Sequence, residues 1–200
     1  HDFRTPLTLI LAPLNELLQK SRQLASLPDE FSRKLEIIRN SATKLMNLVN
    51  QLIDFRKAET GSMKLHASQN NLEEFVNEVC HPFFELASAR RIRFNLNSRL
   101  SEKMAWFDLE KMEFILNNLL SNAFKAAPEG GKVEVSLTDV DDFFKISVID
   151  NGPGIPENEI NHIFDRFYQV VKNENFGSSG IGLSLSKTLT ELHRGNIKAE

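Results

Sequence analysis

The 200-residue sequence is poor in several residue types, and each shortage limits what the protein can be. It has one cysteine, Cys80, one tryptophan and one tyrosine. A single cysteine cannot form an internal disulfide, which favours a reducing, cytosolic setting. No apolar run approaches the ~18 residues of a membrane span, and no signal peptide is present. A disulfide-stabilised secreted domain and a membrane-crossing segment are therefore both disfavoured.

Neither sign of charge is in large excess. The chain has 24 basic and 27 acidic residues and a net charge of -3, so it lacks the basic face of a nucleic-acid-binding domain. Hydrophobic residues make up 41% and charged residues 26%, as in ordinary soluble proteins of one or two domains. Both ends are expected to be cuts in a longer protein, since the chain starts at His1 and stops after an apparent strand start, GNIKAE.

Apolar residues repeat at heptad spacing in the first sixty residues, which predicts two helices separated by SLPDE. The second helix is expected to start near Pro28, with Ser26 or Asp29 as its cap, and to end near Gly61. One hairpin offers only a thin core, so we expect a homodimer in which two hairpins form a four-helix bundle. A hairpin packed on the rest of its own chain is the alternative. The heptad positions are Phe3, Leu7, Ile10, Leu14, Leu17, then Phe31, Leu35, Ile38, Ala42, Leu45, Val49 and Leu52.

The remainder of the chain alternates strand and helix patterns, which predicts an α/β sandwich with helices on one face of a mixed sheet. Asp108 is expected to cap a long helix, and Gly195 to end the last one. With the helical hairpin, the fold class is α+β. The expected strands are residues 63–67, 91–98, 132–140 and 143–151, and the expected helices are residues 71–90, 108–127, 156–168 and 181–195.

The segment DNGPGIP, residues 150–156, follows an expected strand. Gly152 and Gly154 permit backbone approaches that a side chain would block. The carboxylate of Asp150 is placed to accept a hydrogen bond from an exocyclic amine such as that of adenine. A plain tight turn is the alternative.

The segment GSSGIGLSLSK, residues 177–187, leads a glycine-rich loop into a helix. Free amides at a helix N-terminus bind phosphate. The segment is not a Walker A loop, because no Gly-Lys-Ser/Thr ends it, and it is not a dinucleotide fingerprint, because no strand immediately precedes it and the glycine spacing differs. A hinge followed by a helix is the alternative.

Asn118, Asn122 and Lys125 are spaced i, i+4 and i+7, so they share one face of the long helix. Two amides and a lysine in one stripe suit an oxygen-coordinated Mg²⁺ and a polyphosphate. A solvated helix face is the alternative.

Five segments in this order resemble the sequence boxes of bacterial sensor histidine kinases: HDFRTPL, NNLLSNAFK, DNGPGIP, FDRFY and GSSGIGLSL. The segments RTPLTLILAPL and VNQLIDFRKAE are most similar to hybrid two-component kinases, in which a receiver domain follows on the same polypeptide. The resemblance implies a dimerisation and histidine-phosphotransfer hairpin over residues 1–60. It implies a Bergerat-type (GHKL) ATP-binding domain over residues 61–200, with its final strands missing.

The same resemblance implies the chemistry. His1 would be the phosphoacceptor, Asp2 would orient its ring, and Thr5 would help to place a water that removes phosphate from a receiver. The expected function is ATP-dependent autophosphorylation of His1 and transfer to a receiver aspartate. A non-catalytic ATP-binding dimerisation scaffold is the alternative. Another ATPase of the superfamily is disfavoured by the hairpin that carries His1.

The implied cofactors are ATP and Mg²⁺, with Asn122 as the metal ligand. Residues 164–180 would form a lid over the nucleotide. Ala126, Ala127 and Gln169 depart from the usual aromatic, threonine and arginine of the family, so ATP binding is expected to survive but to be weaker. The implied nucleotide-binding residues are Asn118, Asn122, Lys125, Asp150, Gly152, Gly154, Tyr168, Ser179, Gly180, Ile181, Gly182 and Leu183.

The expected partners are a second copy of the chain and a receiver domain, in the same polypeptide or a separate one, with no nucleic acid and no direct membrane contact. The resemblance implies the cytoplasmic portion of a bacterial sensor anchored in the inner membrane. The histidines at 66, 81, 162 and 193 show no metal-ligand spacing and are expected at the surface or its boundary. Cys80, Phe83, Phe84 and Trp106 are expected to pack in the interior.

Overall fold

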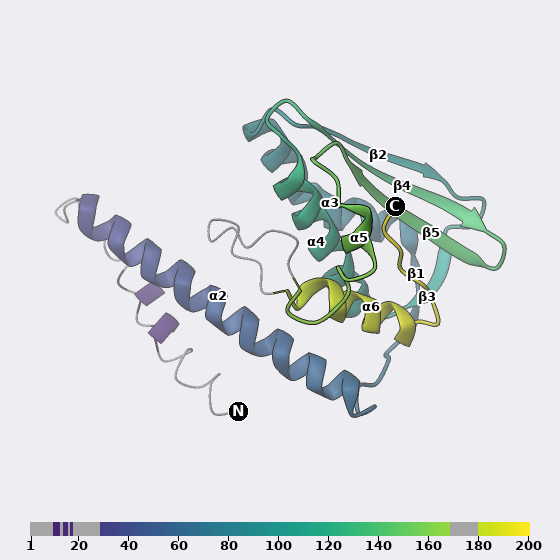
Figure 1. Cartoon of the computed structure of the whole chain (residues 1–200), viewed down its shortest axis with the longest axis horizontal. Helices are drawn as coiled ribbons and strands as arrows, with labels where there is room; N and C mark the ends of the chain where they lie inside the picture. The colour runs from purple at the N-terminus through teal and green to yellow at the C-terminus, as the bar shows by residue number, and fades with distance from the viewer. Residues whose placement is uncertain (1–9, 13, 16, 18–28, 169–179) are drawn as a thin grey trace. The chain divides into compact units, whose positions relative to one another are not determined.

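The chain folds into two compact units, residues 1–62 and residues 63–200. The structure is a computed structural model, and it describes residues 10–12, 14, 15, 17, 29–168 and 180–200. Figure 1 labels its helices and strands. The sequence pattern predicts the division at residue 60.

The described part of the first unit is helical except at residues 60–62. Residues 10–12, 14, 15 and 17 are helical, and α2 spans Asp29–Glu59. Beyond its end, Gly61 adopts a left-handed φ of +65°, a conformation that glycine accepts without strain. The expected start signals Ser26 and Pro28 lie outside the described residues.

Apolar side chains of the first unit fall into a buried set and an exposed set. Leu14 and Leu35 are each 7% exposed and pack as a small cluster. Ala42, one heptad after Leu35, is 8% exposed. The exposed set lies at heptad spacing too, with 47% to 52% of each side chain open in the single chain: Ile10, Leu17, Ile38, Leu45 and Leu52.

The second unit contains a mixed three-stranded sheet. Its strands are β2 (Arg93–Arg99), β4 (Lys132–Val140) and β5 (Phe143–Asp150), in the order β2-β4-β5. β4 runs parallel to β2 and antiparallel to β5. A separate antiparallel pair joins β1 (Ser68–Asn71) to β3 (Met104–Phe107).

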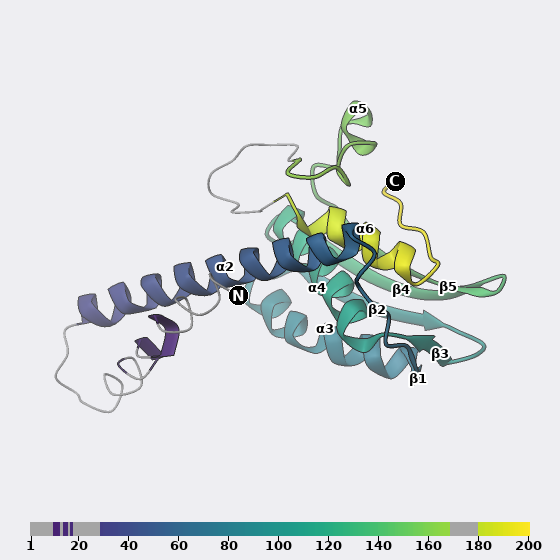
Figure 2. The ribbon, with the colours of Figure 1, turned by 90° about the horizontal axis from the view of Figure 1, so that it is seen from below.

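Helices cover the sheet, as expected for an α/β sandwich (Figures 1 and 2). The helices against the sheet are α3 (Leu72–Ala89) and α4 (Leu109–Ala126); the unit also contains the short α5 (Glu157–Ile160) and α6 (Gly182–Leu192). α3 contacts β2, α4 contacts β5, and α6 packs on α4. Within the described parts of the chain, no helix is both long and apolar enough to cross a membrane.

The core of this unit lies between the sheet and helices α3 and α4. Alternate residues of β4 face it, so Val133, Val135 and Leu137 are at most 1% exposed. The ring of Phe124 packs against those of Phe83 and Phe94, with centroids 5.3 and 5.2 Å away. These contacts fix α4 firmly on the sheet.

Cys80 is buried in the same core, as the sequence predicts. Burial raises the pKa of its thiol to about 11, so the sulfur stays protonated and packs as a small apolar group.

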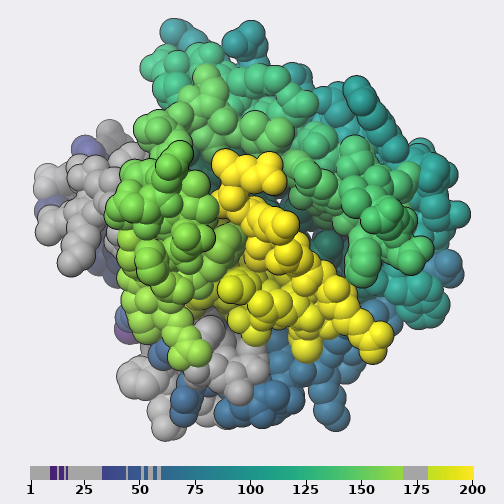
Figure 3. Space-filling model, turned by 45° about the vertical axis from the view of Figure 1, so that its right-hand side comes forward, coloured from purple at the N-terminus to yellow at the C-terminus, as the bar shows by residue number. Residues whose placement is uncertain are grey.

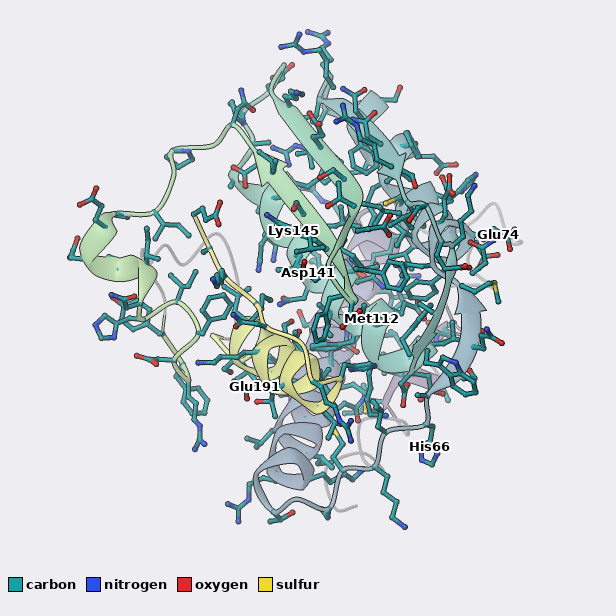
Figure 4. The ribbon with its side chains drawn as sticks, turned by 90° about the vertical axis from the view of Figure 1, so that its right-hand side faces the viewer. His66, Glu74, Met112, Asp141, Lys145 and Glu191 are labelled. Carbon is teal, nitrogen blue, oxygen red and sulfur yellow. The ribbon has the colours of Figure 1, made fainter. Side chains whose placement is uncertain are left out.

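Asp108 caps α4 as predicted, and it also joins three segments. Its Oδ1 accepts from the Lys111 amide, while its Oδ2 accepts from Lys111 Nζ at 2.6 Å and from the His66 amide at 2.8 Å. The Asp108 amide donates to Nε2 of His193, whose Nδ1 donates to the carbonyl of Leu189. The start of α4 is thus tied to the end of α6. In Figure 4, Met112 marks the first turns of α4 and Glu191 the end of α6. His66 marks the segment between α2 and β1.

Three expectations about secondary structure are wrong. Residues 63–67 do not form a strand, and the edge strand is instead β1, which pairs with β3, a strand that the pattern missed. The helix expected over residues 156–168 is limited to α5, with turns after it. α6 ends at Leu192 rather than at Gly195, because Arg194 takes the left-handed conformation, with φ of +60°.

Two aromatic side chains are less buried than expected. Trp106 is 71% exposed, because β3 alternates and points Ala105 and Phe107 inward instead. Phe84 is 45% exposed, although its ring contacts that of Phe94. Phe83 packs against the core as predicted.

Candidate functional site

α4 carries the polar stripe that the sequence predicts on a helix whose other face is buried. Asn118 and Asn122 are half-buried and Lys125 is exposed, whereas Leu116, Leu120 and Phe124 are at most 1% exposed. Within the described part of the chain, Asn122 and Lys125 take part in no hydrogen bond or ion pair between side chains. Their polar atoms are therefore available to a ligand.

Asn118, in contrast, contacts α6. Its Nδ2 donates a hydrogen bond to Oγ of Ser186 over 2.9 Å. Its Oδ1 lies so close to Gly182 that a Cβ at Gly182 would be only 2.3 Å from it. The first turn of α6 therefore lies directly against the middle of α4, and a side chain at position 182 would displace the amide of Asn118.

The end of β5 approaches the C-terminal end of α4. The Gly152 amide donates to Oδ1 of Asp150 over 2.8 Å, which closes a small turn. A Cβ at Gly152 would lie 2.8 Å from the carbonyl oxygen of Ala126 and 2.9 Å from its Cβ. Glycine at 152 thus allows this backbone to touch α4. Asp150 is exposed, and its Oδ2 has no hydrogen bond to any described residue.

Gly154 and Asn151 shape the same turn. Gly154 has a φ of +74° and nothing within 4 Å of where a Cβ would lie. Glycine is therefore favoured here by the left-handed backbone conformation and not by close packing. Asn151 was not singled out from the sequence. Its Oδ1 accepts from the Lys132 amide at 2.6 Å, which ties the turn to the start of β4.

A backbone hydrogen bond joins Phe167 to Gly180, just before α6. The Phe167 amide donates to the carbonyl of Gly180 over 2.9 Å. Gly180 has a φ of +68°, and a Cβ there would lie 2.6 Å from the carbonyl carbon of Phe167. Residues 169–179, with Gln169 and Ser179, lie outside the described residues.

α6 starts without a side-chain cap. Ile181, which precedes its first residue, has an apolar side chain that cannot accept a hydrogen bond, and no side chain among the described residues caps the helix. The buried Ser184 uses its hydroxyl to donate to the carbonyl of Ile181 at 2.9 Å. An uncapped N-terminus carries partial positive charge, which favours an anion. Figure 3 shows α6 and the C-terminal residues (yellow) at the surface, beside the light-green segment that contains α5.

Tyr168 belongs to a small polar cluster around α5. Its hydroxyl donates to Oε2 of Glu159, and its ring lies 5.6 Å from that of His162. His162 Nδ1 in turn lies 2.8 Å from a carboxylate oxygen of Asp165. The hydrogen bond to Glu159, followed by burial, raises the pKa of the Tyr168 hydroxyl. In this arrangement the hydroxyl is occupied within the protein.

The structure brings two of the predicted glycines, Gly152 and Gly182, against α4, the helix that carries Asn118, Asn122 and Lys125. Gly152 touches α4 near its end, Gly182 touches it near its middle, and Asn122 lies between the two contacts in sequence. The arrangement offers an acceptor at Asp150, an amide oxygen at Asn122, and cationic groups at Lys125 and the start of α6. His1, Asp2 and Thr5 lie outside the described residues.

The side chain at this face that could hold a Mg²⁺ ion is the amide of Asn122. In the described parts of the chain, no group of three or more histidine, cysteine, aspartate or glutamate side chains could hold a metal ion. The open amide of Asn122 fits a Mg²⁺ that takes its other ligands from phosphate and water.

Two matches to protein families agree with this geometry. Residues 1–61 match the His Kinase A (phospho-acceptor) domain, and residues 107–200 match the family of histidine kinase-, DNA gyrase B-, and HSP90-like ATPases. Histidine kinase P4 of Formosa agariphila is 38% identical over 204 residues, which cover 99% of this chain and 14% of that protein.

This chain belongs to the sensor histidine kinases. The resemblance drawn from the five sequence segments is thereby confirmed, as are the α+β fold class and the GHKL type of the second domain.

Solved histidine kinases share the fold. Full-length ShkA in complex with AMPPNP matches with a TM-score of 0.80 and 25% identity, over 96% of this chain and 39% of that chain. The histidine kinase ThkA in complex with the response regulator TrrA matches with a TM-score of 0.67 and 25% identity, over 100% of this chain and 55% of that chain.

Proposed function

We propose that this histidine kinase core transfers the γ-phosphoryl group of ATP to His1 and then passes it to an aspartate of a receiver domain. The observation that carries the proposal is the convergence of two glycine turns on the polar face of α4. Gly152 lies against Ala126, and Gly182 lies against Asn118. This arrangement leaves Asn122 and Lys125 open, near the start of α6, to one ligand that has both a base and phosphates.

Each open group suits one part of ATP. Asp150 would accept a hydrogen bond from the adenine amine through Oδ2, because its Oδ1 already accepts from Gly152. Lys125 and the uncapped start of α6 would meet phosphates. Asn122 would hold Mg²⁺, which when bound neutralises phosphate charge. ShkA, solved with the ATP analogue AMPPNP, has the same fold.

The transfer step needs a neutral imidazole at His1. One ring nitrogen would attack the γ-phosphorus, a P–N bond would form, and the bond from phosphorus to the β,γ-bridging oxygen would break to release ADP. Asp2 would accept a hydrogen bond from the other ring nitrogen and stabilise the positive charge that grows on the ring. Thr5, one helical turn after His1, would help to place the water that later removes phosphate from the receiver.

We also propose that the chain acts as a homodimer through residues 1–60. The support is the exposed apolar stripe on α2. Ile38, Leu45 and Leu52 lie seven residues apart, and each is 47% to 50% exposed in the single chain. A second copy of the same stripe would cover it and complete a four-helix bundle.

The receiver belongs to a response regulator or, in a hybrid kinase, to the same polypeptide. ThkA has been solved with its response regulator TrrA, and it covers the whole of this chain in fold. The chain would be the cytoplasmic portion of a bacterial sensor anchored in the inner membrane.

Labelled ATP tests the proposal. The chain is incubated with γ-labelled ATP and Mg²⁺, and the bound label is tested for lability in acid and stability in alkali. We expect label on wild type and none on His1→Gln, with nucleotide binding unchanged in that variant. Binding without any labelled histidine would instead support the non-catalytic scaffold.

A further inference from the structure

The contact between α4 and α6 depends on a buried hydroxyl. Ser186 is 0% exposed, and its Oγ accepts the hydrogen bond from Nδ2 of Asn118 at 2.9 Å. A buried hydroxyl is costly unless it is bonded, and the half-buried amide of Asn118 would lose a partner if this bond were broken. The two side chains therefore hold each other in place.

Gly182 and Ser186 are four residues apart, so they lie on the same face of α6. Together they form a notch that receives the side chain of Asn118. Ser186 binds the amide nitrogen, and Gly182 leaves room for the amide oxygen, which would lie 2.3 Å from a Cβ at that position. A larger residue at 182 would clash with the Asn118 amide oxygen. An apolar residue at 186 would remove the hydrogen bond to its nitrogen.

The notch separates the roles of the two asparagines of α4. The Asn118 amide is committed to α6 through its nitrogen, and its oxygen faces the first turn of that helix. Asn122, one turn further on, has no hydrogen bond to a described residue. Asn118 thus sets the distance between α4 and the start of α6, while Asn122 stays open between them.

We propose that Ser186 is a positioning residue of the nucleotide site. Its hydroxyl fixes the Asn118 amide, and this holds the glycine turn at the start of α6 where the phosphates of ATP bind. The inference rests on the proposed function, because it assumes that the ligand is a nucleotide. Ser186 itself does not touch the nucleotide.

A double-mutant cycle of Ser186→Ala and Asn118→Ala tests this role. The dissociation constant of Mg²⁺–AMPPNP is measured for wild type, both single variants and the double variant. We expect Ser186→Ala to weaken binding about five- to tenfold. The double variant should bind no worse than Asn118→Ala alone, since the two side chains act through one hydrogen bond.

Two further variants separate positioning from stability. Thr188→Ala removes a hydroxyl of α6 that bonds only to the carbonyl of Ser184, and we expect nucleotide affinity within about twofold of wild type. Ser186→Thr keeps the hydroxyl and should restore most of the affinity. The melting temperature without nucleotide is recorded for every variant, and Ser186→Cys replaces Ser186→Ala if the latter does not fold.

The outcomes are distinct. If wild type does not bind AMPPNP, the proposed function fails first. If wild type binds, and Ser186→Ala lowers only the melting temperature, then Ser186 is structural and the inference is overturned. It is also overturned if the effects of the two single variants multiply in the double variant.

Discussion

The two units of this chain differ in how much of their apolar surface they bury. The second unit closes its own core, with Val76, Leu120 and Val133 all 0% exposed. The first unit leaves Leu45 and Leu52 about half exposed, at heptad spacing. The difference indicates that the second unit buries its main core within one chain, whereas the first unit has an apolar surface that a second copy would cover. Changes in the first unit should therefore act on association, and changes in the second on folding and ligand binding.

The largest effect is expected from breaking the exposed stripe of α2. Leu45→Asp removes a leucine from each side of a symmetric interface, and burying a leucine side chain is worth about 1.5 to 3 kcal/mol. Dimerisation should weaken by about 3 kcal/mol or more per dimer, which is over a hundredfold. Sedimentation equilibrium at micromolar concentration measures this change. Asn47→Asp, at an exposed polar position of the same helix, should leave the dimer intact, and a Leu45→Asp dimer of full strength would refute the interface.

A methyl group added inside the second unit should act on folding instead. Gly182→Ala places a Cβ 2.3 Å from Oδ1 of Asn118, and such overpacking costs about 1 to 3 kcal/mol. Urea unfolding of the full chain measures the loss. The same change in an Asn118→Ala background should cost much less, because the clashing amide is gone. An equal cost in both backgrounds would mean that the two residues do not touch.

Asp108 should make the stability of the second unit depend on pH. Burial opposes its ionisation, but hydrogen bonds from the Lys111 ammonium and from the amides of His66 and Lys111 outweigh it and lower the pKa. A lowered folded-state pKa adds stability above the ordinary value near 3.9, and this stability is lost as pH falls through the folded value. Asp108→Asn keeps a capping oxygen but loses the charge, at a cost of about 1 to 2 kcal/mol at pH 7.

The test of Asp108 is the difference in urea stability between wild type and Asp108→Asn as a function of pH. We expect a constant difference from pH 7 to pH 5, which shrinks below about pH 4. Glu110→Gln, at an exposed position of the same first turn, should show a difference of a few tenths of a kcal/mol at most. A difference for Asp108→Asn that grows in acid would contradict the assignment.

The smallest effect is expected at Ala126, where the resemblance to histidine kinases implies an aromatic residue. Ala126 is exposed and lies against Gly152, so Ala126→Phe would add a ring beside the turn that contains Asp150. A stacking contact with adenine is worth about 1 kcal/mol, so the dissociation constant of AMPPNP should fall about fivefold. Isothermal titration calorimetry measures this, with Ala126→Leu as a control for added bulk. Unchanged affinity in Ala126→Phe would argue that adenine lies elsewhere.

Much of the second unit could be predicted from local pattern. β4 was predicted at its observed bounds because its apolar residues alternate strictly, and α4 because Asp108 precedes a helical apolar pattern. β1 was missed because its four residues, SQNN, have no apolar alternation. Its strand conformation depends on pairing with β3, and the residues of β1 alone do not predict this pairing.

The candidate site also has some features that local sequence predicts and others that depend on how distant segments pack. Glycine turns and the asparagine stripe are visible in the sequence because each motif is short and ordered. The bond between Asn118 and Ser186 joins residues 68 apart, and it depends on how two helices pack. The C-terminal end of α6 was misplaced because glycine normally takes the left-handed position, whereas here Arg194 takes it.

The most direct test of the account is the response of backbone amides to nucleotide. Nitrogen-15 NMR spectra of the chain are compared with and without Mg²⁺–AMPPNP. The account predicts shifts at Asn122, Gly152 and Gly182 and at the start of α6, with little change at Trp106 on β3. Saturating nucleotide that moves none of these amides, or only amides of the β1–β3 pair, would contradict it.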